Sequence, residues 1–192
     1  MQTLTFAVPS TLGLRVTSEE FAAIAAVNRD LRLERTANGE LIVSPPTGGE
    51  SSRRNIKIGR YLDEWTDGYG GVCFDSSSGF ELPNGATRAP DAAWVSQERW
   101  GALTPDEKEG FVPLCPDFVV ELRSRTDRLS VLRDKMREYV DNGARLGWLI
   151  DPQERRVEIY RSDREVEILE QPEQLSGEDV LPGFTLSLRG VL

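Results

Sequence analysis

A strand, a helix and a second strand follow one another between residues 117 and 150, and this order constrains the fold more than any other part of the sequence. Residues 118–122 (Phe-Val-Val-Glu-Leu) are apolar except for one acid, which predicts a strand buried on both faces. Residues 129–142 carry apolar side chains along one side of a helix that Gly143 ends, and residues 146–150 are apolar again. Two strands joined by a helix pack most simply as parallel neighbours with a right-handed crossover.

The other patterns complete a mixed α/β domain. We interpret residues 1–192 as one domain, with a core at about 15–165, an N-terminal helix and hairpin extension, and a C-terminal strand extension at 165–192. The expected elements are a helix at 18–29 capped by Ser18, a hairpin of strands 31–35 and 40–43 around Ala37-Asn38-Gly39, a helix at 50–65, strands at 71–82 and 88–95 around Asn84-Gly85, a connection at 96–112 with a short helix, and strands at 156–160, 165–169 and 184–188.

The sequence contains no histidine, and this narrows the chemistry. Ser-His-Asp, Cys-His and HEXXH sites are excluded, as is every mechanism with a histidine base. A metal would have to be held by oxygen atoms, which favours Mg²⁺ or Mn²⁺ over zinc. Cys73 and Cys115 are 42 residues apart with no CxxC pattern, so we interpret them as buried thiols. The net charge of −9 means that nucleic-acid binding would need a local basic patch or a metal that screens the carboxylates.

Hydropathy argues against a membrane. No apolar run approaches the ~20 residues that cross a bilayer. The first 15 residues lack a charged start followed by a long apolar stretch, so no secretory signal is predicted. We therefore expect a cytoplasmic protein with no membrane partner.

Three residues have the chemistry of a phosphodiester-cleaving site. Glu121 stands in a strand expected to be buried, where a charge is costly unless it is paired or binds a cation. Asp91 begins an apolar strand, and Lys135 lies at the edge of the apolar stripe of the following helix. Two carboxylates and a lysine suit metal-assisted hydrolysis. The alternatives are structural: a Glu121–Arg123 ion pair, an aspartate that starts a strand, and an exposed lysine lying over an apolar face.

Four segments, in this order, resemble a known family. They are 89–96 (APDAAWVS), 116–124 (PDFVVELRS), 135–143 (beginning KMREY and ending in Gly143) and 148–152 (WLIDP). Over roughly residues 15–165 the chain resembles the bacterial family called "putative restriction endonuclease" within the PD-(D/E)XK nuclease superfamily. The resemblance implies a restriction-endonuclease-like fold, in which helices flank a mixed β-sheet. It also implies Mg²⁺-dependent cleavage of DNA as the ancestral activity.

The resemblance also implies site residues. Asp91 and Glu121 match the two metal-binding acids. The lysine expected two residues after Glu121 is replaced by Arg123, and Lys135 stands where this family commonly displaces that lysine. Arginine stays charged and cannot exchange a proton, so we expect Lys135 to be the catalytic cation and Arg123 to contact a phosphate. The superfamily often uses a further acid near the first core helix, and three alternatives remain open: Glu50, Glu34 and Glu40.

Basic residues gather on the helix expected at 50–65 and just after Glu121. We expect phosphate contacts from this group, whose alternative interpretation is a solvated surface: Arg53, Arg54, Lys57, Arg60, Arg123, Arg125 and Arg128.

Three functions are therefore open. The first is an Mg²⁺-dependent DNA endonuclease, in which Asp91, Glu121 and Lys135 converge within about 5–6 Å, the reach of strong charge coupling. The second is a nuclease-fold domain that binds nucleic acid or a protein partner without cleaving, which Arg123 and the acidic net charge favour. The third, a hydrolase of small phosphoesters, ranks last because no Gly-rich phosphate loop is present. A homodimer or higher homo-oligomer is also expected, with contacts from strands 156–160 and 165–169 and from Trp94, Trp100 and Trp148.

Overall fold

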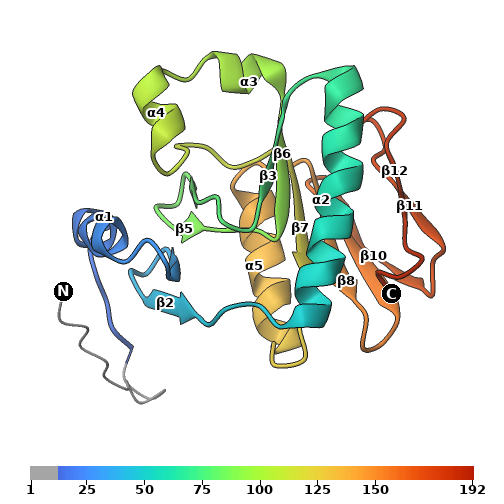
Figure 1. Ribbon diagram of the computed structural model, residues 1–192, viewed down its shortest axis with the longest axis horizontal. Coiled ribbons are helices and arrows are strands. Elements are labelled where there is room, and N and C mark those ends of the chain that lie inside the picture. The colour runs from blue at the N-terminus through green and yellow to red at the C-terminus, as the bar shows by residue number, and fades with distance from the viewer. Residues whose placement is uncertain (1–12) are drawn as a thin grey trace.

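A six-stranded mixed sheet forms the centre of the molecule, seen in a computed structural model that describes residues 13–192 (Figure 1). Its strands lie in the order β10 (Arg164–Glu170), β9 (Arg156–Arg161), β8 (Leu146–Asp151), β7 (Phe118–Leu122), β6 (Ala92–Val95) and β3 (Val72–Asp75). Helix α2 (Gly49–Tyr69) packs on one face, and α5 (Leu129–Asp141) packs on the other. This is the mixed sheet flanked by helices that the sequence predicts.

Strands β7 and β8 form the expected parallel pair. Phe118 lies opposite Leu146 and Leu122 opposite Ile150, and α5 makes the connection between the two strands. Every residue of β7 is buried. Because side chains alternate along a strand, Phe118 packs into the cluster beneath α2, whereas Val119 packs into the cluster beneath α5. The same alternation turns Glu121 toward α5.

A smaller sheet stands beside the main one and carries the N-terminal part of the chain. Its order is β2 (Leu41–Ser44), β1 (Arg32–Arg35), β5 (Thr87–Arg88) and β4 (Phe80–Glu81), and α1 (Ser18–Val27) precedes it. The predicted strands 71–82 and 88–95 are wrong as continuous strands, since each is split between the two sheets. The side chain of Asp75 binds the N–H of Ser77 in a turn after β3, and Pro90, which has no N–H to donate, separates β5 from β6. The Asn84-Gly85 turn joins β4 to β5 as expected.

Other differences from the sequence expectations are local. Thr17, not Ser18, caps α1, because its hydroxyl accepts the N–H of Glu20 while the Glu20 carboxylate accepts the N–H of Thr17. The connection before β7 holds two short helices, α3 (Gln97–Gly101) and α4 (Pro105–Glu109). The C-terminal strand β12 (Thr185–Ser187) pairs with an unexpected strand, β11 (Gln174–Ser176).

The burial of several side chains differs from what the sequence predicts. Trp94 and Trp148 are buried in the core, so they are not available for contacts between subunits. Cys115 is buried as expected, whereas Cys73 is partly exposed, and both are free thiols. None of the helices in the described part of the chain is long and apolar enough to span a membrane. The expectation about a secretory signal concerns a segment that lies largely outside the described residues.

Gly71 provides a test of the packing between β3 and β6. Its φ is +83°, and a Cβ added there would lie 2.7 Å from the carbonyl oxygen of Val95 and against the indole of Trp94. Gly70 has a similar φ of +86° but open space around it. We expect Gly71→Ala to lower the free energy of unfolding by about 1–3 kcal/mol more than Gly70→Ala, because overpacking adds to the backbone strain. Urea unfolding of both variants measures the difference, and equal losses would contradict this packing.

Candidate active site

The three residues expected to carry chemistry line one cleft. Asp91, Glu121 and Lys135 lie on its wall, together with residues of the β1–β2 hairpin, the start of α2 and the loop after β7. The cleft has a volume of about 1230 Å³. It therefore opens where the small sheet meets the end of β7 and the side of α5.

Lys135 joins two carboxylates inside this cleft. Its Nζ lies 2.7 Å from Glu121 Oε1 and 2.7 Å from Glu34 Oε1, and it donates to the carbonyl oxygen of Ala89 at 3.2 Å. All three side chains are buried, with Lys135 only 9% exposed. An ammonium group has three donors, so each of them has a partner. We call Glu34, Lys135 and Glu121 the ion triad.

The sequence explains how α5 presents this lysine. Lys135 and Tyr139 are four residues apart, so they lie on the same face of the helix, which is packed against β7. The Tyr139 hydroxyl donates to Glu121 Oε1 at 3.1 Å. From the sequence, Tyr139 is only one of the side chains on the apolar side of the helix expected at 129–142. Its hydroxyl was the missed signal, because a buried tyrosine usually needs a hydrogen-bond partner.

Asp91 lies beside the same end of β7. Its Oδ2 accepts the N–H of Leu122 at 2.9 Å, and its own N–H donates to the carbonyl of Val120 at 3.0 Å. Its Oδ1 accepts from Arg32 Nη2 at 3.2 Å and from Asn55 Nδ2 at 3.2 Å. The backbone contacts on both sides of Glu121 bring the two carboxylates to the same place in the cleft.

The pKa values of the two acids of the ion triad are shifted in opposite directions. Burial raises the pKa of Glu121 to about 7, against the pull of Lys135 and with support from the nearby charge of Asp91. Burial also pushes the pKa of Glu34 upward, but Lys135 and the Ala89 N–H outweigh it, so that pKa lies below its usual value. Burial alone would lower the pKa of Lys135, yet the two carboxylates raise it. The lysine therefore stays protonated, and Glu34 is its firmer anionic partner.

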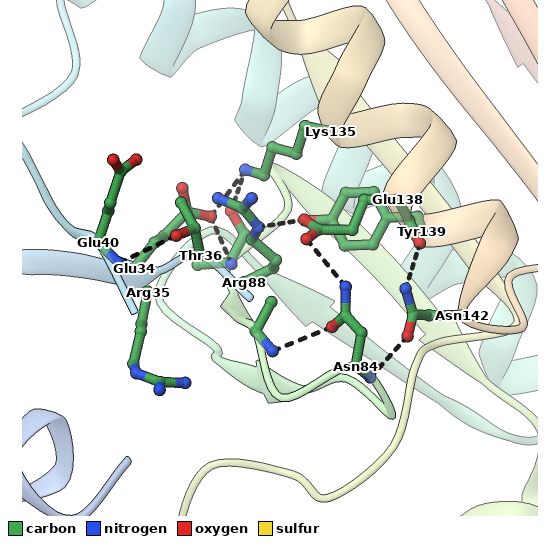
Figure 2. A network of polar contacts seen from close by, with 12 residues as sticks. Glu34, Arg35, Thr36, Glu40, Asn84, Arg88, Lys135, Glu138, Tyr139 and Asn142 are labelled. Atoms are coloured by element: carbon green, nitrogen blue, oxygen red, sulfur yellow. Dashed lines mark hydrogen bonds and ion pairs between the residues drawn. The ribbon is translucent and has the colours of Figure 1, made fainter. Parts of the chain in front are cut away.

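A polar network holds the small sheet against α5 (Figure 2). Arg88 Nε lies 2.5 Å from Glu138 Oε2, and Asn84 Nδ2 donates to Glu138 Oε1 at 3.0 Å. The N–H of Asn84 donates to Asn142 Oδ1 at 2.8 Å. Next to this network, the Ala89 N–H donates to Glu34 Oε1 at 2.7 Å. These contacts fix the position of the small sheet relative to α5, and therefore the position of Glu34 on β1.

Comparison with known proteins shows the family of this chain. The model of the family described as "Uma2: Putative restriction endonuclease" matches residues 18–189. The chain belongs to the Uma2 family. A crystal structure described as a putative nuclease belonging to DUF820, from Anabaena variabilis, has a TM-score of 0.70 at 20% sequence identity and covers 83% of this chain and 88% of that chain. This similarity supports the fold.

Two further findings complete the comparison. A cryo-EM structure of a DrdV–DNA complex has a TM-score of 0.40 at 16% identity and covers 80% of this chain and 12% of that chain. No curated protein matches the chain.

The three candidates for a further acid lie in different surroundings in this Uma2-family site. Glu34 is 7% exposed and belongs to the ion triad. Glu50 is exposed at the start of α2, where it pairs with Arg53 at 3.0 Å. Glu40 is half-exposed and lies 4.0 Å from Arg15. All three acids line the cleft, and among the described residues Glu34 is the one of the three that contacts Lys135.

Five of the seven basic residues divide into two groups, and neither group includes Arg60, which lies over the Tyr61 ring, or Arg128, which is exposed just before α5. Arg54, Arg123 and Arg125 line the cleft. Arg123 does not pair with Glu121, as one interpretation expected, because it binds Asp151 at 2.8 Å. The side chains of Arg53 and Lys57 instead donate to the carbonyl oxygens of the C-terminal segment, at Gly190 and Arg189.

The oxygen atoms of the site fit a hard cation held mostly by water. Within residues 13–192 no cluster of three or more acidic, histidine or cysteine side chains is arranged to hold a metal. Mg²⁺, however, commonly uses one or two carboxylates and keeps several waters. Asp91 and Glu121 supply two such carboxylates, and the buried Oδ1 of neighbouring Asn55 has no hydrogen-bond partner among residues 13–192. The donor set therefore fits Mg²⁺ or Mn²⁺.

Lys135→Met tests the ion triad. The variant leaves Glu34 and Glu121 buried without their cation, so we expect the free energy of unfolding to fall by about 3–5 kcal/mol. Arg164→Met is the control, since Arg164 is exposed and pairs only with the exposed Asp163 in the described residues; its effect should stay within about 0.5 kcal/mol. Urea unfolding compares the two, and a Lys135→Met variant as stable as the wild type would contradict a stabilising triad.

Proposed function

We propose that this Uma2-family chain is a divalent-cation-dependent endonuclease that hydrolyses phosphodiester bonds of DNA in the cleft. The observation that carries the proposal is the meeting of Asp91 and Glu121 beside one buried lysine. Lys135 lies 2.7 Å from Glu121, and the Asp91 carboxylate binds the N–H of Leu122, the next residue of the strand. The family and the fold agree with this function.

Asp91 and Glu121 would hold the cation, Mg²⁺ or Mn²⁺. When bound, such a cation polarises a phosphate and lowers the pKa of a water molecule that it binds. Tyr139 and Lys135 both donate to Oε1 of Glu121, and its Oε2 accepts no hydrogen bond from a described residue. The two donors therefore orient Glu121 while one oxygen stays free for a ligand. The fixed charge of Lys135 offsets the carboxylates and lets an anionic phosphate approach.

DNA is the proposed partner, with phosphate contacts at the mouth of the cleft. Arg54, Arg123 and Arg125 line the cleft and can meet a phosphate backbone. Arg53 and Lys57, two of the other sequence candidates, would have to leave their carbonyl partners first. We also propose a homo-oligomer, because one such site cuts one strand of a duplex at a time.

A second candidate is a nuclease-fold domain that binds DNA or a protein without cleaving. It is favoured by one observation: each site acid already has a cationic partner, Arg32 on Asp91 and Lys135 on Glu121. DNA binding that ignores Mg²⁺ and survives Glu121→Gln would support this candidate over the nuclease.

A plasmid cleavage assay with Mg²⁺ or Mn²⁺ tests the proposed activity. We expect Asp91→Ala and Glu121→Gln each to slow cleavage by about 10²–10³-fold, because each removes a carboxylate that would hold the cation, and the cation would stabilise the charge of the reacting phosphate. The control is Asp106→Ala, which removes an exposed acid on α4 and should cleave at the wild-type rate.

The same assay tests the choice of the third acid. Glu34→Gln should slow cleavage, whereas Glu50→Gln should not, because Glu50 is exposed and pairs only with Arg53 and Arg54 among the described residues. Cleavage by Asp91→Ala at the wild-type rate would reject the nuclease proposal.

A further inference from the structure

The lysine of the ion triad has no donor left for a substrate. Its Nζ already donates to Glu121, Glu34 and the Ala89 carbonyl. A phosphodiester has only acceptor oxygens, so it is recognised by N–H donors that carry positive charge. A direct contact to a phosphate in the cleft must therefore come from another cation, unless the triad is broken.

Besides Lys135, Arg32 is the cation that contacts a site acid from the wall of the cleft. Residues two apart on a strand share a face, so β1 presents Arg32 and Glu34 to the same side. The Arg32 side chain lines the cleft and is 26% exposed. Burial favours a neutral guanidinium, but the charges of Asp91, Glu121 and Glu34 outweigh it and hold the pKa of Arg32 above its ordinary value. Arg32 therefore lies close enough to interact with the charges of all three acids.

The guanidinium of Arg32 is only partly used. Its Nη2 donates to Asp91 Oδ1 at 3.2 Å and to the Ala89 carbonyl at 3.0 Å. Its Nε and Nη1 donate to no described residue. A guanidinium presents its donors as a planar fork that matches two oxygens of a phosphate. The edge of the Arg32 guanidinium that carries Nε and Nη1 can therefore bind a ligand in the cleft.

The other arginines of the cleft are less suited to this position. Arg88 is buried and lies 2.5 Å from Glu138, and Arg123 lies 2.8 Å from Asp151. Arg54 and Arg125 make no ion pair with Asp91, Glu121 or Glu34 in the described part of the chain. Of the arginines that line the cleft, Arg32 combines proximity to the site acids with free donors.

We propose that Arg32 binds the phosphate of a nucleic acid in this site, and that it does so by leaving Asp91 when a divalent cation takes that carboxylate. The inference rests on the proposed nuclease function. A guanidinium and a metal ion on one carboxylate repel each other, so cation binding weakens the Arg32–Asp91 contact. A phosphate can then replace Asp91 as the anionic partner of Arg32. Cation binding and phosphate binding are coupled through this one side chain.

The variant Arg32→Gln should change the two affinities in opposite directions. Mg²⁺ should bind about tenfold more tightly, because the cation no longer competes with a charged hydrogen-bond donor on Asp91. Isothermal titration calorimetry with Mg²⁺ alone measures this. Binding of a short labelled DNA duplex in Ca²⁺, which takes the same kind of oxygen ligands, should weaken. The slope of log K against log[KCl] should become shallower by about 0.9, the value for one lost phosphate contact.

Two control variants separate charge, geometry and position. Arg32→Lys keeps the charge and loses the planar fork, so DNA affinity should fall while the salt slope stays. Arg164→Gln removes one positive charge from the exposed strand β10, and neither affinity nor slope should change. Thermal unfolding checks that each variant is folded. If Arg32→Gln does not fold, Arg32→Lys carries the test, and unchanged DNA affinity in that variant overturns the proposal.

The outcomes distinguish this inference from the nuclease proposal. A wild type that binds Mg²⁺ and DNA, with the same salt slope as Arg32→Gln, overturns the role of Arg32 and leaves the nuclease function standing. A slope difference that is as large in EDTA as in Ca²⁺ overturns the exchange between Asp91 and phosphate. A wild type that binds neither Mg²⁺ nor DNA overturns both proposals.

Discussion

The ion triad of Glu34, Lys135 and Glu121 is the interaction on which the cleft depends. Its members come from β1, α5 and β7, which belong to separate parts of the chain. Removing charges from water costs several kcal/mol per ion, so the triad is tolerable only when every charge finds partners. Lys135 donates to three acceptors. The Ala89 N–H donates to Glu34, and the Tyr139 hydroxyl donates to Glu121. The small sheet must therefore dock on α5 for the main sheet to keep Glu121 inside.

The small sheet does more than cover the end of β7. It brings Glu34 to Lys135, Arg32 to Asp91 and Arg88 to Glu138, so the contacts that hold it in place are also the contacts that set the charge of the site. Asp91 and Glu121 consequently have different partners, an arginine at the cleft surface and a lysine in the interior. Two carboxylates in unequal surroundings are suited to unequal roles, which is how many hydrolytic sites work.

Part of this site could be predicted from the residues. An acid inside an apolar strand pointed to Glu121, and helical spacing placed Lys135 near it. The family resemblance pointed to Asp91, which pattern alone left as an aspartate at the start of a strand. The choice among Glu34, Glu40 and Glu50 stayed open, because local pattern does not show which of the three acids is buried beside Lys135. Arg32, Asn55 and Tyr139 were missed, since each acts through a contact with a residue at least 18 positions away.

The sequence by itself determined the local chemistry and the order of the elements. Periodicity predicted the parallel pair β7–β8, and the absence of histidine limited the site to oxygen and nitrogen donors of other residues. The tertiary structure decided which charges meet. The break at Pro90 divides one predicted strand between two sheets, and that division, rather than any local pattern, sets Glu34 2.7 Å from Lys135 and Arg32 3.2 Å from Asp91. Local patterns report which face of an element is buried, but the partner of a buried charge depends on packing between distant segments.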